Sequence, residues 1–410
     1  MSRTETETSV RIVFLDNIRY LMIVFVVVYH SVAAYATVAP WWGVHDGSFF
    51  MADIIRELFD VFMMPVVFFI SGCFALPSLE KEGVKEFIKD KGKRLLIPWA
   101  LGVFVVTPLI LYDRPDQLVK PFWNYWLNWI GSFKTGLSSQ PPFMPQTNQG
   151  VYWFVSLLFA FFVLFAVFHT ATRRWRSRTA LNIPRKENSG NSVLVTLMLF
   201  GVMTSAVYFF SLLFMPDLSW FTLSAFLQFE PTHLVLSVSY FALGVYAKSR
   251  GWFAEQKPLG SPARWGAISV VLAIVFLATV QPLYANPSGT PNLSVQLLAA
   301  LAFTRSFLLL SMLVMLVSVG VRYWNHSTNF DRQLSKTSYG IYITHVWFVV
   351  IVQTSLMEIW TGGSPLAKFA IVFPLSLALS FAVNRWLGRY RRALAVALLL
   401  LFVICLALRP

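Results

Sequence analysis

The sequence predicts an all-α fold, a polytopic transmembrane helical bundle of ten core spans with an eleventh span at the C-terminus. Of the 410 residues, 57% are hydrophobic and only 13% are charged, about half the ~25% that soluble domains carry. The mean hydropathy is +0.62. The apolar residues form runs of roughly 20, as membrane helices require, without the alternation that marks barrel strands.

Eleven apolar segments define the spans. They cover residues 18–38, 57–76, 95–112, 151–169, 193–214, 233–249, 265–283, 295–319, 335–355, 367–385 and 393–408. We assign residues 1–390, with the first ten spans, to one membrane domain. Residues 391–410 hold a short aliphatic span without internal polar groups, which reads as a C-terminal anchor.

The basic residues predict the orientation. All but seven of the 33 lysines and arginines fall in alternate loops, which lie on one side if the N-terminus is cytoplasmic. We therefore expect a multi-pass protein of the plasma (inner) membrane. The net charge of +14 then reflects topology and contact with membrane lipid, and nucleic acid is not an expected partner. The pattern leaves open whether the protein is a homodimer.

The first span carries Arg19 near its start and His30 deep inside it. Eleven residues are three helical turns plus about 20°, so both side chains project from nearly the same face, about 16 Å apart. Ionisable groups in a membrane are costly and often functional. The plainer interpretations are a topology-setting arginine that pairs with Asp16, and a histidine that is hydrogen-bonded to another helix. Asp16 would alternatively cap the helix.

Acidic residues open the second span. Glu57 and Asp60 lie three residues apart on one helix face near the outer edge. They are candidates for raising the basicity of His30 or orienting an acceptor, or they form an interfacial pair. Ser71 and Gly72, later in the span, are small enough for close helix packing.

A basic cluster precedes the third span. Lys91, Lys93 and Arg94 follow a loop of alternating charge. Such clusters usually fix topology or meet anionic lipid. They are also suited to binding the phosphates of a nucleotide-type donor.

Further polar residues lie inside later spans. Ser338, Tyr342 and His345 form one stripe on the ninth span. Arg305, in the eighth, cannot lose its proton and must face a partner, a cavity or the interface. These four are candidates for the substrate path, with interhelical hydrogen bonding as the alternative. Glu230 and His233 suggest a cap at the outer end of the sixth span.

Other chemistry is not indicated. The two cysteines, Cys73 and Cys405, lie in apolar runs, which excludes a disulfide framework, and no metal-ligand spacing or glycine-rich nucleotide loop occurs. We expect no metal and no tightly bound cofactor. The loop 113–150 contains Trp123, Trp126 and Trp129, which suit an interfacial aromatic belt or, alternatively, stacking on a sugar.

Six segments in order resemble the membrane-bound acyltransferase family 3. They are FLDNIRYLMIVFVVVYH, FFISGCF, KGKRLLIPW, YWFVSLLFAF, YFALGVYAKSRGWF and SYGIYITH. The first contains the family's Arg-x10-His spacing, and the resemblance covers about residues 10–390. The segment FMMPVVFFISG resembles the glucan-modifying succinyltransferase and sugar O-acyltransferase branch of the family.

The resemblance implies an O-acyltransferase. It would move an acetyl or succinyl group from cytoplasmic acyl-CoA to a hydroxyl of an extracytoplasmic glycan or lipid-linked sugar. His30 matches the residue taken as catalytic in the family and Arg19 the one needed for the donor. The family often has Arg-x-x-Arg before the third span, whereas this chain has Lys91 and Arg94, which keeps the charge but loses one bidentate guanidinium.

A different class would use the same residues. A transporter of a small anionic or sugar solute could line its path with intramembrane polar groups. Transporters often show related halves and paired broken helices, and the sequence shows neither clearly.

Overall fold

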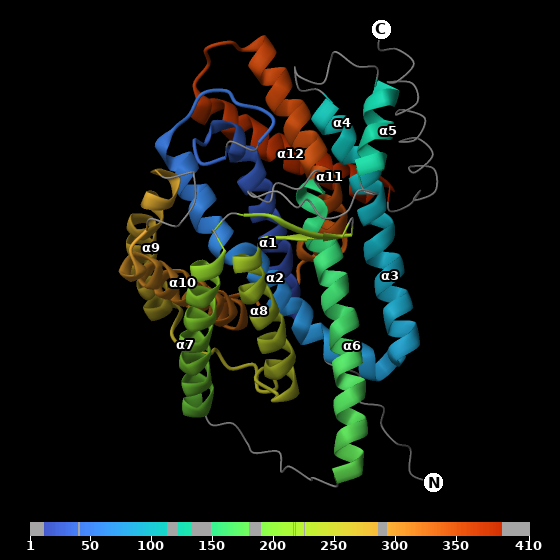
Figure 1. Ribbon diagram of the computed structural model, residues 1–410, viewed down its shortest axis with the longest axis vertical. Helices are drawn as coiled ribbons and strands as arrows, with labels where there is room; N and C mark the ends of the chain where they lie inside the picture. Colours follow the sequence, from blue (N-terminus) through green and yellow to red (C-terminus); the bar gives the residue numbers. More distant parts are fainter. Residues whose placement is uncertain are drawn as a thin grey trace.

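The computed structural model describes residues 12–39, 42–112, 122–132, 149–179, 190–215, 217, 219–224, 226–285 and 293–387. The helices that match the predicted spans lie side by side in a bundle, and a short β-ribbon crosses it (Figure 1). The predicted eleventh span, 393–408, lies outside the described residues.

All ten core spans are helical, as predicted. The first half contains α1 (Val13–Val32), η1 (Ala33–Tyr35), α2 (Phe50–Glu82), α3 (Val84–Leu101), η2 (Gly102–Val106), α4 (Thr107–Tyr112), α5 (Phe122–Ser132), η3 (Gly150–Tyr152), α6 (Trp153–Thr179) and α7 (Gly190–Phe214). The second half contains β1 (Phe221–Ser224), β2 (Leu227–Phe229), α8 (Pro231–Ser249), α9 (Pro262–Ala285), α10 (Val295–Tyr323), α11 (Asn329–Ile359) and α12 (Pro365–Leu387).

In the described part of the chain, eight helical segments are long and apolar enough to cross a membrane. They correspond to every predicted core span except the third and the sixth. The sixth, α8, is a continuous helix that carries more polar residues. The third is divided among α3, η2 and α4.

The segment before the third span differs from the prediction. The chain turns at Gly83, whose φ of +75° favours glycine, and α3 begins at Val84. The charged stretch up to Arg94 is therefore helical rather than a loop.

The third span widens into a π-helix at Gly102–Val106, which loosens the regular backbone hydrogen bonding. The hydroxyl of Thr107 donates to the carbonyl of Gly102 at 3.1 Å, the indole of Trp126 to that of Phe104 at 2.9 Å, and the indole of Trp129 to that of Val103 at 3.2 Å. Two tryptophans of the loop thus bind backbone groups of the neighbouring span.

Two helix pairs position the site. α2 crosses α8 in close contact, with glycines of both helices at the crossing. α1 packs against α11, and the amide of Asn17 at its start donates to the carbonyls of Trp324 and His326 at 2.8 and 3.0 Å. Because Trp324 and His326 lie in the short link between α10 and α11, α1 and α11 begin at the same end of the bundle and run in the same direction.

Three of the loops predicted to be cytoplasmic lie at one end of the bundle. The α2–α3 turn, the end of α6, the start of α7 and the end of α8 all lie toward the bottom of Figure 1. We call this the basic end, because the predicted cytoplasmic lysines and arginines flank these elements. The opposite end is called the outer end.

Candidate active site

Two histidines from distant parts of the sequence meet between α1 and α11. Nδ1 of His30 lies 3.2 Å from Nε2 of His345, and both side chains are buried. His30 is in the last turn of α1, two residues before its end. The parallel packing of α1 and α11 brings the predicted base and a predicted channel residue into direct contact.

The backbone fixes the proton positions of this pair. Nδ1 of His345 lies 2.7 Å from the carbonyl of Tyr342, and Nδ1 of His30 lies 2.9 Å from the carbonyl of Val26. A carbonyl only accepts, so we assign a proton to Nδ1 in each ring. In the neutral rings, the one Nδ1 proton of His30 is then shared between the carbonyl of Val26 and Nε2 of His345, and Nε2 of His30 keeps its lone pair. That nitrogen has the character of a base.

The outer side of His30 is covered by a tryptophan and a glutamine. The ring of Trp42 lies against the imidazole, with centroids 5.4 Å apart. Its indole donates to the side-chain oxygen of Gln353 at 2.9 Å, and the amide of Gln353 donates to the carbonyls of His30 and Ser31 at 3.2 and 3.0 Å. Gln353 lies eight residues after His345 on α11, and this spacing was the only signal that could have indicated it in advance.

Arg19 lies near the basic end of the same helix. Its guanidinium forms an ion pair with Asp16 at 3.0 Å and a hydrogen bond to Ser335 at 3.3 Å. The predicted pairing with Asp16 is confirmed. The alternative role of Asp16 as a helix cap is wrong, because the N-cap of α1 is Ile12.

The other predicted donor-binding residues lie on α3. Lys91 is 3.6 Å from Asp90 and lies over the ring of Phe87 at 5.2 Å. Arg94 pairs with Asp90 at 2.8 Å, and the exposed Lys93 lies between them in the sequence. α3 packs on α2 and α6, whereas α1 packs on α2, α10, α11 and α12. Arg19 and the basic residues of α3 thus lie on helices that share α2 as a neighbour.

Two predicted channel residues on α11 bind the protein itself. The hydroxyl of Tyr342 donates to the carbonyl of Val151, and the hydroxyl of Tyr152 donates back to the carbonyl of Ile343 at 2.8 Å. Ser338 donates to the carbonyl of Ser335 within its own helix. The tyrosine pair fixes α11 to the start of α6 and holds the backbone that orients His345.

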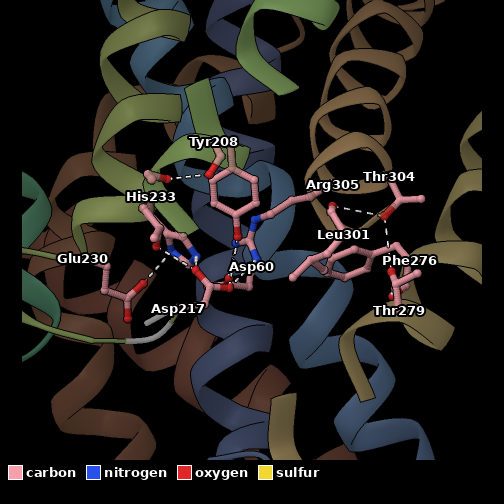
Figure 2. Close-up of polar contacts among 12 residues, drawn as sticks. Asp60, Tyr208, Asp217, Glu230, His233, Phe276, Thr279, Leu301, Thr304 and Arg305 are labelled. Carbon is pink, nitrogen blue, oxygen red and sulfur yellow. Dashed lines mark hydrogen bonds and ion pairs between the residues drawn. The ribbon is translucent and has the colours of Figure 1, made fainter. Parts of the chain in front are cut away.

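A second polar cluster centres on Arg305 (Figure 2). Its guanidinium binds Asp60 on α2 at 2.7 Å and lies 4.0 Å from Asp217, after α7. It also lies over the ring of Tyr208, 5.7 Å from the centroid. Arg305 therefore has partners, one of the outcomes the sequence required for an arginine in a membrane span.

The cluster continues toward the start of α8. Asp217 accepts hydrogen bonds from Tyr208 at 3.0 Å and Thr232 at 2.7 Å. Nε2 of His233 is 3.6 Å from Asp217, and its Nδ1 is 2.5 Å from Glu230. Glu230 occupies the N-cap position of α8 without a side-chain cap hydrogen bond. Its carboxylate binds His233 instead. Glu230 is therefore the N-cap residue by its backbone position, but its side chain does not cap the helix.

Asp60 connects this cluster to the histidine pair through Tyr29. The hydroxyl of Tyr29 donates to Asp60 at 3.3 Å and accepts from Arg56 at 2.9 Å, while its ring contacts that of His30, with centroids 5.1 Å apart. Asp60 is paired with Arg305 and Tyr29 rather than with His30. Glu57, predicted together with Asp60, is buried one turn earlier on α2.

Comparison with known proteins identifies the family. The family model described as an acyltransferase domain, acyltransferase family 3, matches residues 12–385. That range includes all the elements that hold the two polar clusters. No curated protein and no solved structure matches the chain. Because the family model covers nearly the whole sequence and the bundle contains several membrane-spanning helices, the chain belongs to acyltransferase family 3 and is a membrane acyltransferase.

Proposed function

We propose that this protein is an acyl-CoA-dependent O-acyltransferase of the plasma (inner) membrane. It transfers an acetyl or succinyl group to a hydroxyl of an extracytoplasmic glycan or lipid-linked sugar. The observation that carries the proposal is the His30–His345 pair, whose hydrogen bonds leave the lone pair on Nε2 of His30. A base of this kind suits an alcohol acceptor, which must lose a proton to attack.

The donor site follows from the position of Arg19. It lies on the same helix as His30, near the basic end. We place the phosphates of acyl-CoA near Arg19, with Lys91, Lys93 and Arg94 as the further basic groups of that end. The thin pantetheine arm would extend along the face of α1 toward His30, with the N-terminus and the donor on the cytoplasmic side.

The reaction requires only one base. Nε2 of His30 takes the proton of the acceptor hydroxyl while its oxygen attacks the thioester carbonyl and forms the C–O bond. The C–S bond then breaks, and the CoA thiolate recovers the proton from the imidazolium. The reaction involves no oxidation or reduction, and it needs no reactant besides the donor and the acceptor. Nδ1 of His30 meanwhile donates to His345, which keeps the ring oriented throughout.

The test is transfer of label from acetyl-CoA and succinyl-CoA by the purified protein. Replacing His30 with Gln should lower the rate about 10²- to 10⁴-fold, the usual contribution of a general base, and leave acyl-CoA binding intact. His169→Gln, in the second half of α6, is the matched control and should change neither. Full turnover by His30→Gln would exclude the base assignment. Solute counterflow without covalent transfer would instead favour the transporter.

A further inference from the structure

The surroundings of His30 leave few directions from which an acceptor can approach. Trp42 covers the ring and is held by Gln353, and His345 occupies the Nδ1 side. Tyr29 lies on a further side, with its ring edge-on to the imidazole. It is only partly buried, and its hydroxyl points to Asp60. Of these three side chains around the His30 ring, Tyr29 is thus the one that is not fully buried, and its hydroxyl leads to Asp60.

Asp60 is the most exposed member of the cluster. Its side chain is 32% exposed, compared with 16% for His233, 15% for Glu230, 4% for Arg305 and 1% for Asp217. A carboxylate on a membrane helix does not face lipid, so its exposed part faces an aqueous space. Arg305 and Tyr29 fix its orientation from two sides. A carboxylate held in this way is prepared to accept hydrogen bonds from a ligand.

The charge around Tyr29 and Arg305 selects the kind of ligand. The carboxylates of Glu57, Asp60 and Glu230 interact electrostatically with Tyr29, as does Arg56. Asp217 adds a fourth carboxylate beside Arg305. Among the described residues, four carboxylates therefore accompany two arginines and His233, an excess of one negative charge when all of these groups are ionised. A negative site of this kind repels an anionic ligand and accepts neutral hydroxyls.

From these three observations we infer that Asp60 is a specificity-determining residue that binds the acceptor, and that the reacting end of the acceptor is an uncharged polyol such as a neutral sugar. One hydroxyl of the acceptor donates to the carboxylate of Asp60. A second hydroxyl reaches Nε2 of His30 on the other side of Tyr29. The inference rests on the proposed function for the role of His30. It adds the group that orients the acceptor and a reason for excluding acidic sugars.

The experiment measures equilibrium binding of two matched sets of probes to the full-length protein in detergent, without acyl-CoA. One set is a panel of methyl hexosides and pentosides, and the other is their uronic acids. Trp42 provides a fluorescence signal because it lies against His30. We expect at least one neutral probe to bind about tenfold or more tightly than its uronic acid. Equal affinity within each pair, or no binding by any probe, would overturn the inference.

Two variants test the residue. Asp60→Asn removes the charge, and loss of a hydrogen bond to a charged group predicts about 10- to 100-fold weaker binding of the neutral probe. It should also reduce the preference over the uronic acid, which a merely structural role of Asp60 would not do. Tyr29→Phe keeps the charge but removes one of the two groups that orient the carboxylate, and it should weaken neutral probes without changing the preference. It serves as the second variant if Asp60→Asn does not fold.

Asp46→Asn is the matched control, because Asp46 forms an ion pair at 2.5 Å with the buried Lys368. It should leave the preference unchanged, and a loss of preference equal to that of Asp60→Asn would contradict the inference. Acyl-CoA binding and label transfer are measured on the same preparations. Failure of transfer with a retained preference for neutral probes would count against the proposed function alone. Transfer without such a preference would count against the acceptor site alone.

Discussion

An added methyl group at Gly72 should force α2 and α8 apart. A Cβ built on Gly72 would lie 2.1 Å from the carbonyl oxygen of Phe241, and one built on Gly244 would lie 2.0 Å from that of Phe69. Atoms in favourable contact are ~3.5 Å apart. The helices would therefore have to separate by about 1.4 Å to accommodate Gly72→Ala.

The magnitude follows from what the methyl group meets. Overpacking costs roughly 1–3 kcal/mol, and we expect Gly72→Ala at the upper end of that range because a backbone carbonyl cannot rotate away. The same displacement would move Asp60, on α2, relative to Arg305, on α10. The variant should therefore also lose acyl transfer.

The assay is the free energy of unfolding in detergent, with Gly92→Ala as the matched control. A Cβ at Gly92 meets nothing closer than 3.7 Å, and alanine is favoured over glycine inside a helix by about 0.5–1 kcal/mol. Gly92→Ala should therefore be neutral or stabilising. The double variant Gly72→Ala/Gly244→Ala should cost less than the sum of the single variants, since one separation relieves both collisions. Wild-type stability of Gly72→Ala, or strict additivity in the double variant, would refute the reasoning.

Two further substitutions test the polar clusters. Arg305→Met leaves Asp60 and Asp217 without their cation and should cost about 3–5 kcal/mol of stability, as loss of one partner of a buried pair does. The double variant Arg305→Met/Asp60→Asn should recover part of this loss in the same unfolding assay. An unaltered stability of the single variant would contradict the pairing. Gln353→Leu removes the acceptor of the Trp42 indole and should cost about 1–3 kcal/mol. It should also change the fluorescence of Trp42, and an unchanged spectrum would argue against the contact.

The helical content and the presence of many membrane spans followed directly from hydrophobicity. Runs of about 20 apolar residues satisfy the backbone only as membrane helices, so the ten core spans could be predicted from residue type alone. The helix ends were less predictable. α2 and α3 extend into charged segments because alternating charges suit an exposed helix as well as a loop. Gly83 is the residue that separates the two helices.

Individual site residues were predictable in proportion to their cost in a membrane. His30, Asp60, Arg305 and His345 were conspicuous because an ionisable group in a span requires a partner. Gln353 was not conspicuous, because an amide in an apolar helix is common and inexpensive. Its function in holding Trp42 depends on where the loop after α1 folds back.

The sequence by itself determined that this is a helical membrane protein, predicted that its basic loops share one side, and indicated that certain spans carry groups in need of partners. Only the tertiary structure decided which groups meet. Sequence spacing fixes the angle of a side chain on its own helix, but the pairing of His30 with His345, and of Asp60 with Arg305, depends on which helices lie side by side and in what register. That choice is made by contacts such as the glycine crossing of α2 and α8, and they join residues far apart in the chain.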